Sequence, residues 1–238
     1  MAGKKIVVIT DLRSPAARLA ADSLAREGYD VHIPPESLCL WDEDALAAFA
    51  QPLKDALVGV IHPAPPKVLG GIEQFSAEDW QRARDEGPIA AFCVTKVFCG
   101  IFREKGCGAM IYLNSIHAEK PVGKGMLFSM GCGAVQMLCR EVNQDYGRQG
   151  VNCYFVQQGI HEGEEACISD VSPIYCGLDL RYPQRKIPPQ GNLNGLLTFL
   201  LTDAAAPLSG SDLRADSALT MYYNHRHRAE GRRYVNDK

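Results

Sequence analysis

The stretch IYLNSIHAEKPVGKGMLFSMGCGAVQMLCREVNQDYG, residues 111–147, decides the fold expected for this chain. It opens inside an apolar run, 109–114, that is typical of a buried strand, and its second half, 126–146, repeats apolar residues at helical spacing. A buried strand that leads into an amphipathic helix is part of a β-α-β unit, so the stretch predicts a parallel sheet with crossover helices.

The same alternation of strand-like and helical patterns runs along the rest of the chain. Further strands are expected at 4–10, 29–33, 57–62, 151–157 and around Leu213, and further helices at 14–28, from near Asp42, over 76–104 and near 192–202. We therefore expect one α/β domain over residues 1–221, a Rossmann-like doubly wound parallel sheet with helices on both faces and right-handed crossovers.

Three segments depart from this alternation. Residues 62–66, HPAPP, predict a stiff proline loop, and the aperiodic residues 159–190 predict a long loop of the kind found as a lid or an interface arm. The tail, residues 222–238, carries five Lys or Arg against two acidic residues. A basic tail is typical of a solvated end or of a contact with an acidic partner.

Composition limits the classes of function. The 238 residues have a formal net charge of −3, which gives no case for nucleic acid binding, and no apolar stretch is long enough to span a membrane. The start, MAGKKIVVIT, lacks the layout of a signal peptide, so we expect a cytoplasmic protein. Nine cysteines occur without a CxxC pair or zinc-ligand spacing, which favours buried, reduced thiols and no metal site.

Several landmarks resemble the short-chain dehydrogenase/reductase family over nearly the whole chain. WQRARDEGPIAAFCVTK at 80–96 resembles the family helix W-x-R-x-x-D-x-N-x-x-x-x-F-x-x-T, and GVNCYFVQQG at 150–159 resembles its strand G-I-R-V-N-x-V-x-P-G. FLLTDAAAPLSGSDLRADSA at 199–218 resembles F-L-x-S-D-x-A-x-x-x-x-G-x-x-L-x-x-D-G-G. Order and spacing match together, so the resemblance implies the family fold.

The same comparison exposes losses at the cofactor site. The family loop T-G-x-x-x-G-x-G lets the backbone approach a pyrophosphate, but this chain reads TDLRSPAA, with Asp11, Pro15 and Ala17 in place of the glycines. Ser14 before Pro15 predicts instead a helix that caps its own N-terminus. The family turn N-A-G becomes HPAP, which brings in Pro65. The resemblance therefore implies that this chain binds no NAD(P).

The catalytic positions are altered as well. The family uses an Asn, a Ser, a Tyr and a Lys, in which the Tyr is the general acid/base and the Lys lowers its pKa. In this chain those positions hold Gly87, Ser115, Phe128 and Cys132. Phenylalanine has no proton to transfer and cysteine carries no positive charge, so the resemblance implies a chain without catalytic residues.

Two alternatives remain at this point. Ser115, His117 and Cys132 lie close in the expected fold and resemble a nucleophile with a base, which would suit an enzyme with a repurposed site. A stand-alone regulatory protein that senses a metabolite with the old cleft is the other alternative.

The expected assembly follows from the same resemblance. The helices at 76–104 and 126–146 correspond to the family's main dimer face, and 199–218 corresponds to its second interface. We therefore expect a non-catalytic subunit in a heterotetramer with an active paralogue, with NAD bound only in that partner. The chain is similar to the inactive subunit of two-component alcohol dehydrogenases that oxidise 2-(α-hydroxybenzyl)succinyl-CoA in anaerobic toluene degradation.

Two further expectations concern single side chains. Trp41 and Trp80 are expected to be packing residues at helix edges. In the tail, a set of arginines is expected to contact a partner or an anionic substrate group such as the phosphates of coenzyme A: Arg226, Arg228, Arg232 and Arg233.

Overall fold

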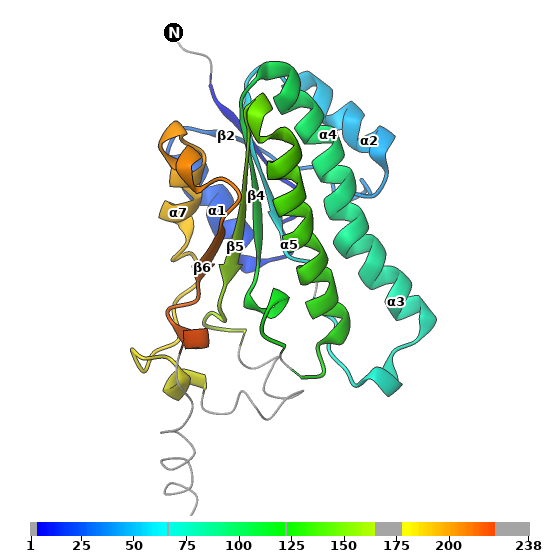
Figure 1. Ribbon diagram of the computed structural model, residues 1–238, viewed down its shortest axis with the longest axis vertical. Coiled ribbons are helices and arrows are strands. Elements are labelled where there is room, and N and C mark those ends of the chain that lie inside the picture. Colours follow the sequence, from blue (N-terminus) through cyan, green and yellow to red (C-terminus); the bar gives the residue numbers. More distant parts are fainter. Residues whose placement is uncertain (1–3, 66, 122, 165–177, 222–238) are drawn as a thin grey trace, which may run out of the picture.

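Six parallel strands form one sheet in the order β2-β1-β3-β4-β5-β6 (Figure 1). The computed structural model describes residues 4–65, 67–121, 123–164 and 178–221. The strands are β1 Ile6–Ile9, β2 Asp30–His32, β3 Leu57–Pro63, β4 Gly108–Ser115, β5 Val151–Gln158 and β6 Asp212–Ala215. All five strand pairs are parallel, which confirms the predicted sheet.

Helices cover both faces of the sheet, as predicted (Figure 1). They are α1 Pro15–Arg26, α2 Glu43–Ala50, α3 Ala77–Arg84, α4 Ala90–Lys105, α5 Met126–Tyr146 and α7 Asn194–Leu200. Helices α2, α4 and α5 enclose one hydrophobic core against the sheet, and α1 and α7 enclose the other. The chain therefore forms a single α/β domain of the doubly wound type.

Successive side chains along each buried strand alternate between the two cores. Along β4, Met110 and Tyr112 point into the core under α4 and α5, while Ile111 and Leu113 point into the core under α1 and α7. Successive side chains of a strand face opposite sides of the sheet, and all four of these are fully buried. This is why the strand reads as a continuous apolar run, as buried parallel strands do.

The helix expected over 76–104 is wrong in one respect, because it is interrupted. A π-helical turn, η3 Asp85–Ile89, separates α3 from α4 and contains Pro88. Proline has no N–H for the helical ladder and its ring displaces the preceding carbonyl, so the regular pattern breaks there. Gly87 is buried inside this turn, which places one of the predicted catalytic positions at the break.

On the β2 side, the sheet has one strand fewer than the usual dinucleotide-binding sheet. In the usual order, 3-2-1-4-5-6, two strands lie beyond the first strand. Here only β2 lies beyond β1, and the chain returns through α2 and η1 Gln51–Leu53 to β3 with no strand across residues 33–56, all of which are described. The first nucleotide-binding half of the sheet is therefore one strand smaller.

The start of α1 departs from the prediction in its capping. Ser14 occupies the N-cap position and Pro15 the first helical turn, but the Ser14 side chain accepts no capping hydrogen bond. Ser14 at the N-cap and Pro15 in the first turn thus match the predicted helix start, but the prediction that Ser14 caps the helix with its side chain is wrong. By contrast, Asp42 caps α2 by accepting a hydrogen bond from the backbone of Ala45.

Some expectations concern residues that the structure does not describe. The tail 222–238 lies outside them, and so does 165–177 within the predicted loop 159–190. A short 3-10 turn, η7 Leu178–Arg181, follows that gap. Within the ranges that the structure describes, no helix is long and apolar enough to cross a membrane.

Candidate functional site

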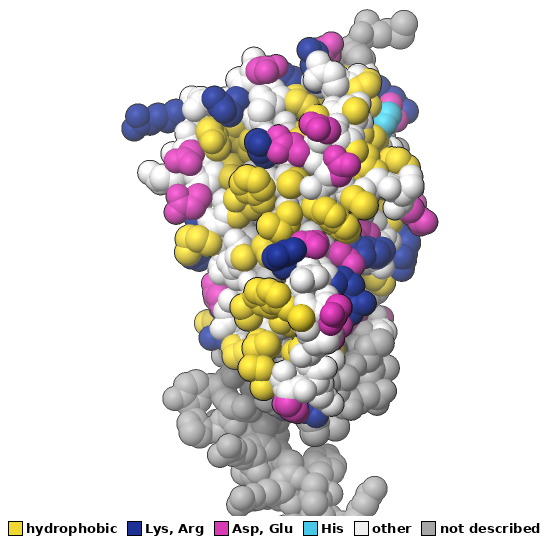
Figure 2. Space-filling model, turned by 90° about the vertical axis from the view of Figure 1, so that its right-hand side faces the viewer, with side chains coloured by type: hydrophobic (Ala, Val, Ile, Leu, Met, Phe, Trp, Pro, Cys, Tyr) yellow, Lys and Arg dark blue, Asp and Glu magenta, His cyan; other side chains and the backbone are white. Residues whose placement is uncertain are grey.

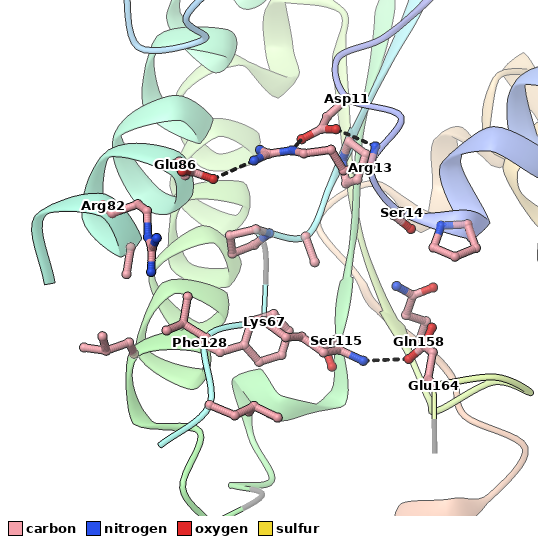
Figure 3. A pocket seen from close by; sticks show the side chains of 18 of the residues that line it. Asp11, Arg13, Ser14, Lys67, Arg82, Glu86, Ser115, Phe128, Gln158 and Glu164 are labelled. Carbon is pink, nitrogen blue, oxygen red and sulfur yellow. Dashed lines mark hydrogen bonds and ion pairs between the residues drawn. The ribbon is translucent and has the colours of Figure 1, made fainter. Parts of the chain in front are cut away.

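A cavity of about 810 Å³ opens at the carboxyl ends of the strands (Figure 3). It is lined by the loops that follow β1 and β3, by the ends of β4 and β5, and by parts of α3 and α5. Ligands of open α/β sheets bind in this crevice. The volume lies in the range of small-molecule sites, so the family cleft is still an open space in this chain.

Three charged side chains, here called the clasp, join the loop after β1 to the helical turn after α3: Asp11, Arg13 and Glu86. The Asp11 carboxylate accepts hydrogen bonds from the backbone N–H and from Nε of Arg13, each at 2.6 Å. Arg13 Nη1 donates to Glu86 Oε2, also at 2.6 Å (Figure 3). Burial opposes the Arg13 charge, but the hydrogen bonds to Glu86 and Asp11 outweigh it and raise the pKa of Arg13. Two carboxylates thus already neutralise this guanidinium.

The N-terminus of α1 offers little else to an anion. Pro15 at the first helical turn has no N–H, and the N–H of Arg13 is already bonded to Asp11. Ala17 is fully buried in the core beneath α1, so its methyl group lies between helix and sheet. The backbone donors that cradle a phosphate in Gly-rich loops are therefore reduced at this helix start.

The end of β3 is filled by neutral groups. His62 lies next to Thr10, the residue that follows β1, and its Nδ1 is 2.8 Å from the Thr10 hydroxyl. Burial lowers the pKa of His62 to about 4, so the ring is uncharged at neutral pH. Pro65 follows, and a Cβ placed on Gly87 or on Gly131 would lie 3.5 or 3.6 Å from the Pro65 ring. Two of the predicted positions, Gly87 and Pro65, therefore lie side by side, and a side chain at position 87 would contact the Pro65 ring.

The remaining catalytic positions lie at the end of β4 and on α5. Ser115 and Phe128 line the cavity and are almost entirely buried (Figure 3). Cys132, one helical turn further on, is fully buried, and burial raises the pKa of its thiol to about 12. Its thiol is thus protonated at neutral pH and offers neither a charge nor a nucleophile.

His117 lies beside these residues but faces another way. Its ring packs edge-on against Phe128 with centroids 5.7 Å apart, and its Nδ1 is 3.1 Å from the Lys120 carbonyl oxygen. Burial lowers the pKa of His117 to about 4. Ser115 Oγ accepts a hydrogen bond at 3.3 Å from the backbone N–H of His117, not from its ring. The structure brings Ser115, His117 and Cys132 together without the base-to-nucleophile hydrogen bond that hydrolytic catalysis needs.

A further ion pair, which the sequence did not indicate, lies on the opposite side of the cavity. Lys67 Nζ lies 2.6 Å from Glu164 Oε2, so the loop after β3 is tied to the segment after β5 (Figure 3). The two residues are 97 positions apart, and no local pattern relates them. Gln158 also lines the cavity; it ends β5, and the rule that ligands bind at the carboxyl ends of strands was the one signal for it.

The remaining expectations concern the arginines of the tail and metal binding. Arg226, Arg228, Arg232 and Arg233 lie outside the described residues. Among the residues that are described, no group of three or more His, Cys, Asp and Glu side chains could hold a metal ion.

Comparison with known proteins identifies the family. Residues 7–220 match a family model described as enoyl-(acyl carrier protein) reductase. The structure of ElxO with NADP bound superposes with a TM-score of 0.80 at 16% identity, over 92% of this chain and 100% of that chain. No curated protein matches the chain.

Two further solved structures agree with that one. A gluconate 5-dehydrogenase from Beutenbergia cavernae with bound NADP, described as putative and NAD(P)-dependent, gives a TM-score of 0.82 at 18% identity, over 92% of this chain and 98% of that one. A short-chain type dehydrogenase/reductase from Mycobacterium ulcerans gives 0.80 at 19% identity, over 92% and 90%. Since the family model spans residues 7–220, nearly the whole chain, the chain belongs to the short-chain dehydrogenase/reductase family.

Proposed function

We propose that this chain is a non-catalytic subunit that assembles with an active, NAD-dependent short-chain dehydrogenase. The observation that carries the proposal is the state of α5, where the Tyr and Lys positions of the family hold Phe128 and Cys132. Phe128 cannot transfer a proton, and the buried Cys132 thiol stays neutral. Ser115 remains, but a serine without a base does not accept a proton at neutral pH.

The clasp supports the absence of a cofactor. A dinucleotide places its pyrophosphate at the N-terminus of the first helix. In this chain that place is flanked by the Asp11 carboxylate, Arg13 is neutralised by Asp11 and Glu86, and Pro15 offers no N–H. The sheet is also one strand shorter on the nucleotide side. Two solved relatives hold NADP, but these residues do not fit a dinucleotide, and we assign NAD to the partner subunit.

Exposed apolar side chains support the assembly. On the helices of the family's main dimer face, Trp80, Phe92, Met130 and Met137 are 43%, 51%, 50% and 52% exposed. Figure 2 shows hydrophobic side chains gathered on the side of the molecule where α3 and α4 lie. Large apolar side chains that stay exposed together mark protein interfaces. Phe199, in the second expected interface, is 40% exposed.

The two tryptophans, expected to be packing residues at helix edges, are partly exposed. Trp41 is 42% exposed and Trp80 is 43% exposed, so more than half of each residue is buried and part of each remains accessible. Their sequence context does not distinguish a ring that packs inside the chain from one that remains for a partner. Tryptophan is enriched where interfaces bind most strongly, and Trp80 on α3 fits that use.

The proposed complex is a heterotetramer of two such chains and two active paralogues. Its two-fold symmetry would bury both expected interfaces, the one on α3 to α5 and the one at 199–218. For the pathway we retain the substrate class implied by the resemblance, an acyl-CoA alcohol such as 2-(α-hydroxybenzyl)succinyl-CoA. Coenzyme A phosphates are anions, and the tail carries the arginines that suit them. The active subunit performs the hydride transfer.

Co-purification tests the proposal directly. The tagged chain, expressed in its native host, is expected to retain a dehydrogenase that carries an intact Tyr-x-x-x-Lys motif. Alcohol oxidation with NAD is expected from the complex and not from the isolated chain. Recovery of the chain as a homo-oligomer alone would favour the stand-alone regulatory alternative, and NAD-dependent turnover by the isolated chain would exclude a non-catalytic role.

A further inference from the structure

The ends of β4 and β5 carry two polar side chains, Ser115 and Gln158, that each keep a hydrogen-bonding group without a partner among the described residues. Ser115 and Gln158 are register partners on these adjacent parallel strands, and both line the cavity. Ser115 Oγ accepts one hydrogen bond from the His117 backbone, and its own hydroxyl hydrogen has no acceptor within the described residues. Gln158 Oε1 is a buried acceptor without a donor in the same part of the chain. Buried polar atoms of this kind call for a partner.

A cation reaches the same place from a different element. Lys67 extends from the loop after β3, and its charge lowers the pKa of Cys132 and of His117, although burial dominates both pKa values. The ammonium group therefore lies near the end of β4, on the side where Ser115 opens to the cavity (Figure 3). Glu164 takes one of its three N–H donors. The other two have no acceptor among the residues that the structure describes.

The rest of this end of the cavity is apolar. Val68 and Leu69 line it from the loop that carries Lys67, and Leu127 and Phe128 line it from the start of α5. A mostly hydrophobic pocket with a few convergent polar groups is the usual form of a small-molecule site. The walls suit a hydrocarbon or aryl body, and Lys67, Ser115 and Gln158 suit one polar end.

Charge decides which polar end fits. The cavity is lined by three cations and three carboxylates: Arg13, Lys67, Arg82, Asp11, Glu86 and Glu164. Because these charges balance, the lining as a whole gives a dianion such as a phosphate monoester no net attraction, while a monoanion needs only the local attraction of Lys67. A carboxylate has two oxygens, one for the ammonium and one for the hydroxyl, and it accepts from both.

We propose that this chain binds a small hydrophobic carboxylic acid in the cavity, with its carboxylate on Lys67 Nζ and the Ser115 hydroxyl and its apolar body against Leu127 and Phe128. Gln158 Oε1 is an acceptor and cannot bond a carboxylate, so the side-chain amide adds a third contact only after a 180° rotation that puts its N–H₂ group in the place of Oε1. The site needs no cofactor and no reaction. It also belongs to the chain itself, so it stands whether or not the proposed partner assembly forms.

Titration calorimetry on the purified full-length chain tests this, with 3-phenylpropionate and octanoate as probes and their primary amides as uncharged counterparts. We expect each acid to bind at least tenfold more tightly than its amide. Lys67→Met is expected to weaken the acids by tenfold or more and to leave the amides within about twofold. Ser115→Ala is expected to weaken the acids by threefold to tenfold.

The matched control is Lys96→Met. Lys96 also pairs with a glutamate, Glu43, at 2.7 Å, but on the outer surface of α4 and α2. The Lys96→Met variant is expected to bind the acids and the amides as tightly as the unchanged chain does. Circular dichroism checks that each variant is folded. Equal affinities for acid and amide, no heat from any probe up to about 10 mM, or unchanged acid binding in a folded Lys67→Met variant would each overturn the assignment. None of these results bears on co-purification with a dehydrogenase, so the two proposals fail separately.

Discussion

The two faces of helix α5 differ sharply in what they retain. The inner face carries Phe128 and Cys132, where the family has its proton donor and its lysine, and both residues are buried and uncharged. The outer face carries Met130, Ala134 and Met137, apolar residues that remain exposed. One helix therefore carries no titratable family residue on its inner face and exposed apolar residues on its outer face. This difference supports the proposal that the chain serves an assembly.

The strongest way to break this comparison is a charge on the outer face. Met137→Asp is expected to weaken association with the partner subunit by about 30-fold or more, since a buried interface anchor contributes about 2 kcal/mol or more. Analytical ultracentrifugation of the mixed subunits measures it. Ile33→Asp is the control, because Ile33 is 39% exposed just after β2, at the far edge of the sheet. Equal loss of assembly in both variants would contradict an interface on α5.

A charge on the inner face is expected to act on the fold. Cys132→Lys, the family residue, puts an ammonium into a fully buried site close to the Lys67 charge. An unpaired buried charge costs about 3 to 5 kcal/mol, which lowers the melting temperature by roughly 10 °C in a domain of this size. Cys132→Ala serves as the volume control. A Lys variant as stable as the Ala variant would mean that this face still accommodates the family charge.

Two of the buried histidines near the carboxyl ends of the strands, His62 and His117, should make stability fall in acid. The folded-state pKa of His62 and of His117 is lowered to about 4, below the usual 6.5, because burial disfavours the charged ring. Their contribution is complete above pH 6.5 and is lost as the pH falls toward 4, by about 2 kcal/mol each at pH 5. Urea unfolding at pH 7.5 and 5 measures this loss. Ring NMR signals that titrate near pH 6.5 in the folded chain would refute it.

The smallest expected effect comes from opening the clasp. Glu86→Gln removes an exposed ion pair with Arg13, and such pairs contribute about 1 kcal/mol or less. The melting temperature should therefore change by no more than about 4 °C, as in the matched variant Glu43→Gln. No dinucleotide binding should appear in fluorescence titrations with NADH, because Asp11 and Pro15 remain. Micromolar NADH binding by this variant would mean that the clasp alone excludes the cofactor.

Hydrophobic patterning made most of the fold predictable. Each expected strand and helix has a counterpart, because buried strands and amphipathic helices leave strong local patterns. The exceptions are local. The π turn at Pro88 lies inside an otherwise continuous helical pattern, and Ser14 holds the N-cap position without making the hydrogen bond. Both depend on geometry that a residue pattern does not encode.

The site was predictable only where it follows a family motif. Ser115, Phe128 and Cys132 lie at the end of β4 and on α5, as the spacing of 111–147 indicated. Lys67 and Glu164 come from distant loops and meet only in the folded chain. Pro65 and Gly87 likewise become neighbours only in the folded chain, although each was singled out from the sequence alone. Residues that act through long-range pairs leave no local signal.

The most direct test of the account is the number of NAD molecules held by the complex from its native source. Native mass spectrometry with an NAD titration gives the subunit composition and the cofactor count together. The account predicts two copies of this chain, two copies of an active paralogue and two bound NAD molecules. Four NAD molecules in that tetramer, or a homo-oligomer of this chain that binds NAD, would contradict it.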